Sequence, residues 1–325
     1  MMQVWVLSDG AAGNEKPALA LAQRFDGAAR IWRLQARAPW RWLSPRRLPA
    51  AARAFGDEFR RALAQPPTLA IGCGRQAALA TRLLRERGSR AVQLLDPRID
   101  PAHWDIVIAP RHDPARGDNV LNTLGSLHAI DDDWLARARR EWPDFAALPT
   151  PRTAVLIGGP TDDAPFTPAD WDALCRQLAA WFARDGGSLL LTTSRRTPAW
   201  LRERARQSFP DLPGRRWTGA QDGDNPYAGL LGWADRLLAT ADSVNLLSEA
   251  AATGKPVYSP LPGNPRGRVG RFHANLIAAG HLRPMSADPQ PWTPTPLREL
   301  DALVRQLRVR LDLPPAARSD NAQAR

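Results

Sequence analysis

The stretch Thr240–Val257, with the sequence TADSVNLLSEAAATGKPV, carries the most specific pattern in the chain. A predicted strand ends at its first residue, and Ser243 is a residue type that caps the start of a helix. The helix is predicted to stop at Gly254, and Pro256 opens the next predicted strand. A strand, a helix and a strand in this order predict a parallel α/β unit.

The start of this helix is a candidate ligand site. The backbone N–H groups of Ser243, Val244 and Asn245 have no partner inside the helix, and they could hold a diphosphate. Glu249 follows within two turns of the cap and could bridge the two hydroxyls of a ribose. Alternatively, Glu249 is an ordinary solvated residue on the helix surface.

Strand and helix patterns alternate through the rest of the chain. The N-terminal half has predicted strands at 3–7, 31–34, 68–71, 91–95 and 105–109, and a second series follows at 153–157, 188–192, 236–240 and 256–259. Such alternation predicts mostly parallel sheets with helices on both faces. The chain has 325 residues, and one hydrophobic core rarely exceeds about 250–300, so we expect two domains.

The boundary between these domains is expected in the proline-containing segment 141–152, which we interpret as a linker. The expected N-terminal Rossmann-like domain covers residues 1–148, and the C-terminal one covers 149–295. A helix over 296–313 could pack back on the N-terminal half. Residues 314–325 are typical of a disordered tail.

Composition excludes several function classes. The net charge of +11 comes almost entirely from arginine, since only Lys16 and Lys255 are lysines, and it favours anionic partners. No zinc-finger, RRM or KH signature is present, so we expect no nucleic-acid partner. No apolar run approaches the roughly 20 residues of a membrane span, and the first residues do not resemble a signal peptide. We therefore expect a cytoplasmic protein, in which Cys73 and Cys175 are reduced thiols outside any metal site.

The loop Ser8–Glu15, with the sequence SDGAAGNE, follows the first predicted strand. Its glycines let backbone N–H groups approach a ligand, so Gly10, Gly13 and Glu15 are candidate ligand-binding residues. The loop lacks the full dinucleotide-binding fingerprint. It could equally be an ordinary turn between a strand and a helix.

Two further loops follow predicted strands in the second half of the chain. Gly158 and Gly159 are expected to line a ligand site, because open α/β sheets bind ligands at the carboxyl ends of their strands. Ser194, Arg195 and Arg196 combine a hydroxyl with two guanidinium groups, which suits an anionic ligand. The alternative for these three residues is a solvated basic loop.

The stretch Thr240–Val257 resembles the donor-site signature of GT-B glycosyltransferases. In that superfamily two Rossmann-like domains face each other across a cleft, the start of a helix contacts the donor phosphates, and a glutamate further along binds the ribose. Ser243 and Glu249 stand where those roles would fall. The pair Gly158-Gly159 is similar to the glycine turn that begins the GT-B C-terminal domain.

A closer resemblance covers nearly the whole chain. It rests on the blocks Ser8-Asp9-Gly10…Gly13-Asn14-Glu15, Asp96-Pro97-Arg98, Pro110-Arg111-His112-Asp113, Asn119-Val120, Ser194-Arg195-Arg196-Thr197, Asn225-Pro226-Tyr227 and Asp242–Val257. These blocks resemble the Elm-type mitochondrial fission family, whose plant members act in recruiting the fission machinery to mitochondria. One difference is that Asn14 stands where many members have histidine. The resemblance implies an α/β, GT-B-like fold of two Rossmann-like, doubly wound domains.

An inverting GT-B enzyme needs a general base near its acceptor, usually from the N-terminal domain. His112 is the leading candidate, with Asp113 and Asp9 as further catalytic candidates, because each follows a predicted strand. An unperturbed histidine has a pKa of about 6.5 and could exchange a proton at neutral pH. The alternative is that His112 is a hydrogen-bonded loop residue that organises Asp113.

The stretch 38–49 mixes tryptophan and arginine as proteins do at bilayer interfaces. Trp40, Trp42, Arg46 and Arg47 are therefore candidates for contact with an anionic membrane surface, and the protein could be peripheral on the inner membrane. Alternatively, the two tryptophans pack under a loop.

The resemblance implies an enzyme that moves a sugar from a nucleotide diphosphate sugar to an envelope-related acceptor. Backbone amides and Arg195 would stabilise the leaving diphosphate without a metal or other cofactor. Asp222-Gly223-Asp224 fits the Asp-x-Asp pattern of metal-dependent transferases, but we interpret it as a polar turn. One alternative is a non-catalytic adaptor or membrane-associated interaction protein that retains the fold. A nucleotide-sugar epimerase is a third reading, which lacks a full dinucleotide fingerprint and a Tyr-x-x-x-Lys pair.

Overall fold

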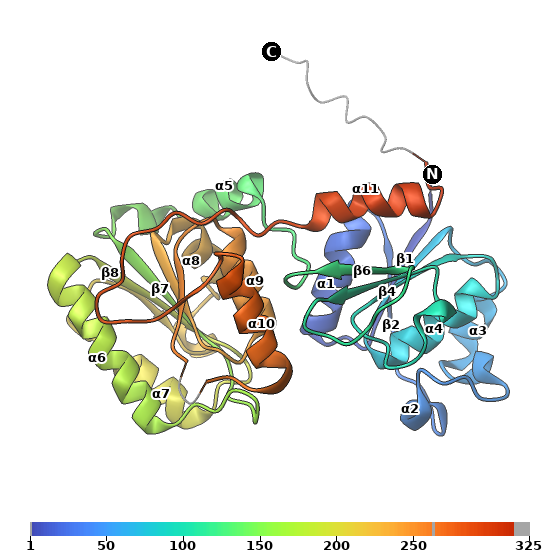
Figure 1. Cartoon of the computed structure of the whole chain (residues 1–325), viewed down its shortest axis with the longest axis horizontal. Coiled ribbons are helices and arrows are strands. Elements are labelled where there is room, and N and C mark those ends of the chain that lie inside the picture. Colours follow the sequence, from blue (N-terminus) through green and yellow to red (C-terminus); the bar gives the residue numbers. More distant parts are fainter. Residues whose placement is uncertain (1, 262–263, 315–325) are drawn as a thin grey trace, which may run out of the picture. The chain divides into compact units, whose positions relative to one another are not determined.

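The structure is a computed structural model that describes residues 2–261 and 264–314 (Figure 1). These residues divide into two compact units. The first takes the described residues up to Thr123 and those from Glu299 onward, and the second is Leu124–Arg298. The expected tail, apart from Pro314, lies outside the described residues.

The first unit is built on a parallel sheet of six strands in the order β2-β1-β3-β4-β5-β6. Every residue of β1, β3 and β5 is buried, as in parallel sheets that carry helices on both faces. The strands are β1 (Val4–Ser8), β2 (Arg30–Arg33), β3 (Leu69–Cys73), β4 (Arg90–Leu94), β5 (Ile106–Pro110) and β6 (Val120–Thr123). The helices are α1 (Ala12–Gln23), α2 (Trp40–Leu43), α3 (Gly56–Ala62), α4 (Arg75–Arg85) and α11 (Leu300–Arg310), with short 3-10 turns η1 (Ala51–Arg53) and η2 (Pro101–His103).

The second unit has another parallel sheet of six strands, in the order β12-β11-β10-β7-β8-β9. From β9 inward this is the Rossmann order 3-2-1-4-5-6, and the order reverses between β7 and β10. The strands are β7 (Arg152–Ile157), β8 (Ser188–Thr193), β9 (Gly214–Trp217), β10 (Arg236–Ala239), β11 (Val257–Ser259) and β12 (Arg283–Pro284). The helices are α5 (Asp132–Glu141), α6 (Pro168–Asp185), α7 (Ala199–Gln207), α8 (Tyr227–Trp233), α9 (Val244–Ala252) and α10 (Gly267–Ala278), with 3-10 turns η3 (Pro143–Ala147) and η4 (Ala220–Asp222).

Alternating side chains of β7 place two hydrophobic cores on the two faces of this second sheet. Val155 and Ile157 join the cluster formed with α6 and α7, whereas Ala154 and Leu156 join the cluster formed with α8, α9 and α10. Figure 1 shows α6 on one side of the second unit and α9 and α10 on the other. The start of α6 is fixed by a capping box, in which Thr167 and Asp170 satisfy each other's backbone N–H groups.

The boundary between the units differs from the one expected at residue 148. The expected linker 141–152 is a packed part of the second unit, because Phe145 belongs to the same core cluster as Leu230 and Leu237. Arg152 also donates from its guanidinium to the carbonyl of Phe145 at 3.0 Å. Proline in this segment starts the 3-10 turn η3 rather than an exposed connection. The helices α5 and α8 and the short strands β6, β9 and β12 were not predicted from the sequence.

The helix α11 belongs to the first unit, although the N-terminal part of that unit ends at Thr123. Arg310 donates to the carbonyl of Asp118 at 2.7 Å, and Arg24 pairs with Asp301 at 3.5 Å. Leu307 is fully buried on the same helix, which therefore contributes to the core of the first unit.

Replacing Leu307 with alanine is expected to lower the free energy of unfolding of the first unit by about 2–5 kcal/mol, because a buried leucine leaves a cavity. Urea unfolding followed by tryptophan fluorescence measures this. Val309→Ala is the matched control on the same helix, since Val309 is 82% exposed, and its effect should stay within about 0.5 kcal/mol. Equal effects of the two variants would contradict the packing of α11 on the first unit.

Candidate functional site

Parallel pairing brings the ends of β7, β8 and β10 to one edge of the second sheet. Leu156 on β7 lies opposite Thr192 on β8 and Ala239 on β10. The loops that follow these strands therefore start side by side at the point where the strand order reverses. Ligands of open α/β sheets bind at such switch points.

The Asp242 carboxylate connects these loops. Its Oδ2 accepts the backbone N–H of Gly159 at 2.9 Å and pairs with the guanidinium of Arg196 at 3.1 Å. Its Oδ1 accepts the hydroxyl of Thr240 at 2.7 Å, and only 4% of the side chain is exposed. Burial raises the pKa of Asp242, while hydrogen bonds and Arg196 act in the opposite direction. No role was predicted for Asp242 from the sequence, although its position between a strand end and a helix cap is a signal for a site residue.

Gly158 and Gly159 are required by contacts within the protein. A side chain at Gly158 would overlap the Asp242 carboxylate, and one at Gly159 would overlap the backbone of Arg196. The N–H of Gly158 donates to the hydroxyl of Thr240 at 2.7 Å, and the N–H of Gly159 donates to the Asp242 carboxylate. Both glycines thus let the loops close on each other, and their N–H groups already have acceptors.

The first turn of α9 contains the donors that remain. Ser243 caps the helix, with its Oγ accepting the N–H of Leu246 at 3.3 Å. Within residues 2–261 and 264–314, the N–H groups of Val244 and Asn245 donate to no acceptor. Two orphan donors at a helix N-terminus favour an anion.

The two arginines of the loop after β8 are exposed, and they differ in their contacts. The Arg196 guanidinium reaches Asp242, whereas no contact of the Arg195 side chain is found among the described residues. Thr197 anchors the loop, since its hydroxyl donates to the carbonyl of Gly158 at 2.6 Å and accepts the N–H of Ser194 at 2.9 Å. Arg196 is therefore the arginine that the fold attaches to the loop beside α9.

Glu249 is not a freely solvated residue, because it is partly buried and accepts the hydroxyl of Tyr227 from the first turn of α8. Burial, together with the negative charge of Glu249, raises the pKa of Tyr227 well above its usual range.

The imidazole of His273 donates from Nε2 to the carbonyl of Ala241 at 2.9 Å, and burial lowers the pKa of His273. The neutral ring therefore carries its proton on Nε2, because a carbonyl only accepts.

The loop after β1 in the first unit is closed by its own side chains. Asn14 donates to both oxygens of Asp9 at 3.1 Å, and Glu15 accepts from Arg33 at 2.8 and 2.9 Å. The N–H of Gly10, which has a φ of 83°, donates to the hydroxyl of Ser8. Gly13 lies within α1.

His112 and Asp113 follow β5, and both side chains are buried, with Nε2 of the imidazole 4.0 Å from Oδ1 of the carboxyl. Two strands, β3 and β4, separate β5 from β1. At about 4.8 Å per strand the ends of β1 and β5 are about 14 Å apart. The first unit therefore brings Asp9 and Glu15 together, but it does not bring His112 and Asp113 to them.

A family model described as mitochondrial fission ELM1 matches residues 12–311. The chain belongs to the mitochondrial fission ELM1 family. It is 34% identical over 251 residues to the mitochondrial fission protein ELM1 of Arabidopsis thaliana, a match that spans 67% of this chain and only 57% of the plant protein. An uncharacterised protein of Rickettsia prowazekii (strain Madrid E) is 25% identical over 309 residues, which cover 81% of this chain and 84% of that protein.

Among solved structures, the UDP-GlcNAc 2-epimerase from Methanocaldococcus jannaschii is similar to this ELM1-family chain. The TM-score is 0.58 at 11% identity, and the match covers 95% of this chain and 99% of that one. This likeness shows the fold alone. The predicted GT-B-like α/β fold class, with two Rossmann-like domains, is confirmed.

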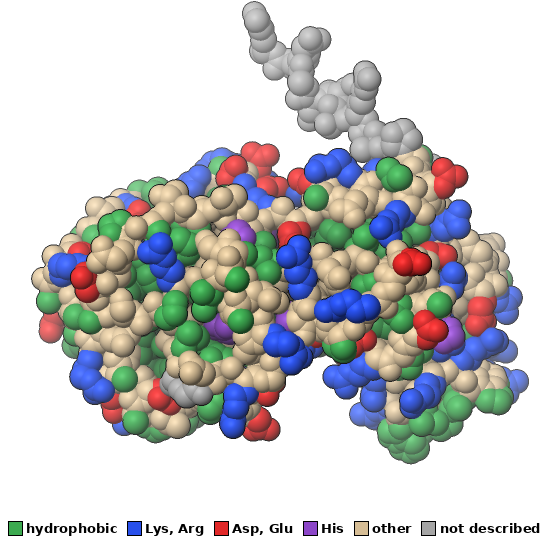
Figure 2. Space-filling view, viewed as in Figure 1, with side chains coloured by type: hydrophobic (Ala, Val, Ile, Leu, Met, Phe, Trp, Pro, Cys, Tyr) green, Lys and Arg blue, Asp and Glu red, His purple; other side chains and the backbone are tan. Residues whose placement is uncertain are grey.

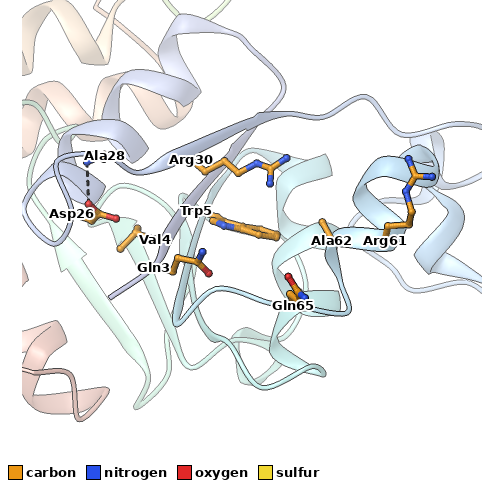
Figure 3. A pocket seen from close by; sticks show the side chains of 9 residues that line it. All are labelled: Gln3, Val4, Trp5, Asp26, Ala28, Arg30, Arg61, Ala62 and Gln65. Atoms are coloured by element: carbon orange, nitrogen blue, oxygen red, sulfur yellow. Dashed lines mark hydrogen bonds between the residues drawn. The ribbon is translucent and has the colours of Figure 1, made fainter. Parts of the chain in front are cut away.

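The first unit of this ELM1-family chain has a cavity of about 260 Å³ at the amino-terminal ends of β1 and β2. Figure 3 shows the side chain of Arg30 above the ring of Trp5, with Gln3, Asp26 and Gln65 around them. Arg30 is already engaged, since it stacks on Trp32 at 4.0 Å and pairs with Glu58 at 3.1 Å. We assign no function to this cavity, because open α/β sheets bind their ligands at the other ends of the strands.

The Asp222-Gly223-Asp224 stretch forms a turn. Asp222 accepts the N–H of Thr218 at 2.7 Å and its hydroxyl at 2.8 Å. In the part of the chain that the structure describes, no three acidic, histidine or cysteine side chains group as a metal site would require.

The short helix α2 contains both tryptophans of stretch 38–49, and their surroundings differ. Trp40 packs against the core of the first unit, whereas Trp42 is 69% and Leu43 is 42% exposed. Arg46 is exposed, and Arg47 pairs with Glu86 at 3.0 Å. Figure 2 shows hydrophobic side chains gathered where α2 lies, with Lys or Arg side chains around them. Among the described helices, none combines the length and the apolar character needed to span a bilayer.

Replacing Glu15 with glutamine is expected to destabilise the first unit at neutral pH. The hydrogen bonds from Arg33 hold the pKa of Glu15 below its usual range, so the carboxylate stabilises the fold above the unfolded-state pKa and loses this effect as the pH falls through the folded-state pKa. Melting temperatures of wild type and variant should therefore differ at pH 7 and converge in acid. Glu58→Gln is the control, because Glu58 is an exposed partner of Arg30. A difference at Glu15 that persists unchanged at low pH would contradict the ionic origin.

Proposed function

We propose that this chain binds a nucleotide diphosphate sugar at the carboxyl edge of the second sheet. The observation that carries the proposal is the pair of N–H donors at Val244 and Asn245, which meet no acceptor in the described part of the chain and lie at the switch point beside Arg196. A diphosphate would accept these two hydrogen bonds, and its charge suits both the helix dipole and the guanidinium.

Glu249 would bind the ribose. It lies five residues beyond Val244 on α9, about 7.5 Å along the helix axis, which is within the span of a nucleoside diphosphate. Tyr227 holds the carboxylate in one orientation through its hydroxyl. A carboxylate oriented in this way accepts ribose hydroxyls at a lower entropic cost than a mobile one.

The chemistry we propose is metal-independent glycosyl transfer to an envelope-related acceptor. The acceptor hydroxyl would attack the anomeric carbon and give its proton to a general base, for which His112, Asp113 and Asp9 are the candidates from the sequence. The nucleoside diphosphate would leave with its charge stabilised by the α9 amides and Arg196, with Arg195 as a second cation nearby.

A second candidate function is a non-catalytic adaptor at a membrane surface. The plant relative is named for mitochondrial fission, and the exposed pair Trp42 and Leu43 beside Arg46 offers apolar and cationic groups to an anionic bilayer. This role would place the protein in the cytoplasm, peripheral on the inner membrane.

UDP is the first nucleotide to test, because the structurally similar epimerase is named for UDP-GlcNAc. UDP at about 100 times its dissociation constant should stabilise the protein by about 2.7 kcal/mol, read as a rise in melting temperature. Glu249→Ala should abolish the rise. Tyr227→Phe is the matched control, since it removes the hydrogen bond from Tyr227 and keeps the Glu249 carboxylate, and it should retain binding.

If neither UDP nor any other nucleoside diphosphate raises the melting temperature, the nucleotide-sugar proposal is wrong. Equal loss of binding in Glu249→Ala and Tyr227→Phe would show instead that the internal contact, and not the ribose, requires Glu249.

The membrane role predicts that the protein floats with vesicles containing anionic lipid at low salt, and that Trp42→Ala abolishes flotation. Val309→Ala on α11 is the control, because Val309 is even more exposed but lies on a helix outside the α2 surface. Protein that stays at the bottom of the gradient with anionic vesicles would exclude this role.

A further inference from the structure

The Asp242 carboxylate lies where an unpaired negative charge would repel the proposed diphosphate. It precedes the cap of α9 by one residue, and the proposed diphosphate would lie on the first turn of that helix. Two negative charges close together near a protein surface repel each other, so an isolated carboxylate here would oppose binding of a diphosphate. The chain nevertheless buries this group and builds three loops around it.

The two side chains of the ion pair between Asp242 and Arg196 differ in their exposure to solvent. Its own side chain is 4% exposed, whereas that of its partner Arg196 is 57% exposed. One Nη of Arg196 meets Asp242, and the guanidinium has five N–H donors in all. Most donors of Arg196 are therefore left for another acceptor, while the position of the group is set by a buried anchor.

The two glycines after β7 complete this arrangement. A side chain at Gly158 would occupy the space of the Asp242 carboxylate, and the N–H of Gly159 is one of its donors. The backbone of Arg196 lies against Gly159, so the same turn fixes both ends of the ion pair. The geometry thus holds Arg196 through its side chain and through its backbone.

We propose that Asp242 is a positioning residue, which fixes the guanidinium of Arg196 so that its remaining donors bind a phosphate of the ligand. This inference rests on the proposed nucleotide site and assigns a role to a residue outside its direct contacts. An arginine held in place before binding loses less side-chain entropy when the phosphate arrives. The net charge of the pair is zero, so the anchor does not repel the ligand as a bare carboxylate would.

A positioning role and simple charge repulsion predict opposite changes in diphosphate affinity for Asp242→Asn. If Asp242 were only a nearby anion, removing its charge would strengthen binding of a diphosphate. If it positions Arg196, the same change frees the guanidinium and weakens binding. Asparagine keeps the size of the side chain and one oxygen for Thr240 or Gly159, so the loops retain part of their contacts.

The first measurement needs no ligand and no variant of Asp242. In NMR spectra of the unliganded protein, hindered rotation of the Arg196 guanidinium should give separate Nη signals, with Arg196→Lys used for assignment. Arg195 is the matched control, because no contact of its side chain is found among the described residues, and its Nη signals should average. Signals of Arg196 that average like those of Arg195 would overturn the proposal, whatever the ligand is.

The second measurement is the affinity for UDP of wild type, Asp242→Asn, Arg196→Gln and the double variant, by calorimetry. Positioning predicts that each single variant binds about tenfold more weakly and that the double variant is no weaker than Arg196→Gln. Asp288→Asn is the control, because it removes an exposed aspartate paired with Arg184 at 2.7 Å, and its affinity should not change. Tighter binding by Asp242→Asn, or fully additive losses, would overturn the proposal.

Failure of the proposed function gives a different pattern. Wild-type protein that binds no nucleotide but shows separate Arg196 signals, which average in Asp242→Asn, would refute the nucleotide site and leave the anchoring of Arg196 by Asp242 supported.

Discussion

The reversal of strand order between β7 and β10 is the constraint on which the candidate site depends. The chain runs outward from β7 through β8 to β9, then returns to the other side of β7 and runs outward again. The helices that follow β7 and β10 therefore pack on opposite faces of the sheet, and their first turns diverge from one point. Parallel pairing brings the loop after β8 to the same edge. A helix N-terminus, an arginine and a glycine turn converge there because of topology, although the contacting residues Gly159 and Asp242 are 83 positions apart in the chain.

The convergence has an energetic cost that the loops themselves offset. Burying a carboxylate is unfavourable unless it is paired and hydrogen-bonded. Asp242 receives a hydroxyl, a backbone N–H and a guanidinium, and glycine is needed where these groups come closest. Among the described residues, the first amides of α9 and most donors of the Arg196 guanidinium meet no acceptor in this frame. In the second unit, then, internal satisfaction of the polar groups leaves a small number of donors for a ligand.

The first unit also has a six-stranded parallel sheet, but the polar side chains after its first strand pair with one another. At the end of its first strand, Asp9 and Asn14 pair with each other, and Glu15 pairs with Arg33 and with the hydroxyl of Ser8. The acidic groups of this loop are thus occupied within the fold. The distinctive feature of this unit is instead α2, where Trp40 anchors the short helix in the core and Trp42 and Leu43 are left in solvent. The two units of this ELM1-family chain therefore present different chemistry, with anion-binding donors on one and an exposed apolar surface on the other.

The sequence by itself determined the fold class, the cap at Ser243 and the restart of the strand pattern near residue 153, because these features rest on local periodicity and on neighbouring residues. It misplaced the unit boundary, since the prolines of 141–152 are typical of a linker and only packing shows that Phe145 belongs to the second core. Tertiary structure alone decided that Asp242 meets Gly159 and Arg196, and that Tyr227 meets Glu249. These pairs are 22 to 83 residues apart in the chain, and such contacts depend on the order of strands in a sheet, which no local pattern encodes.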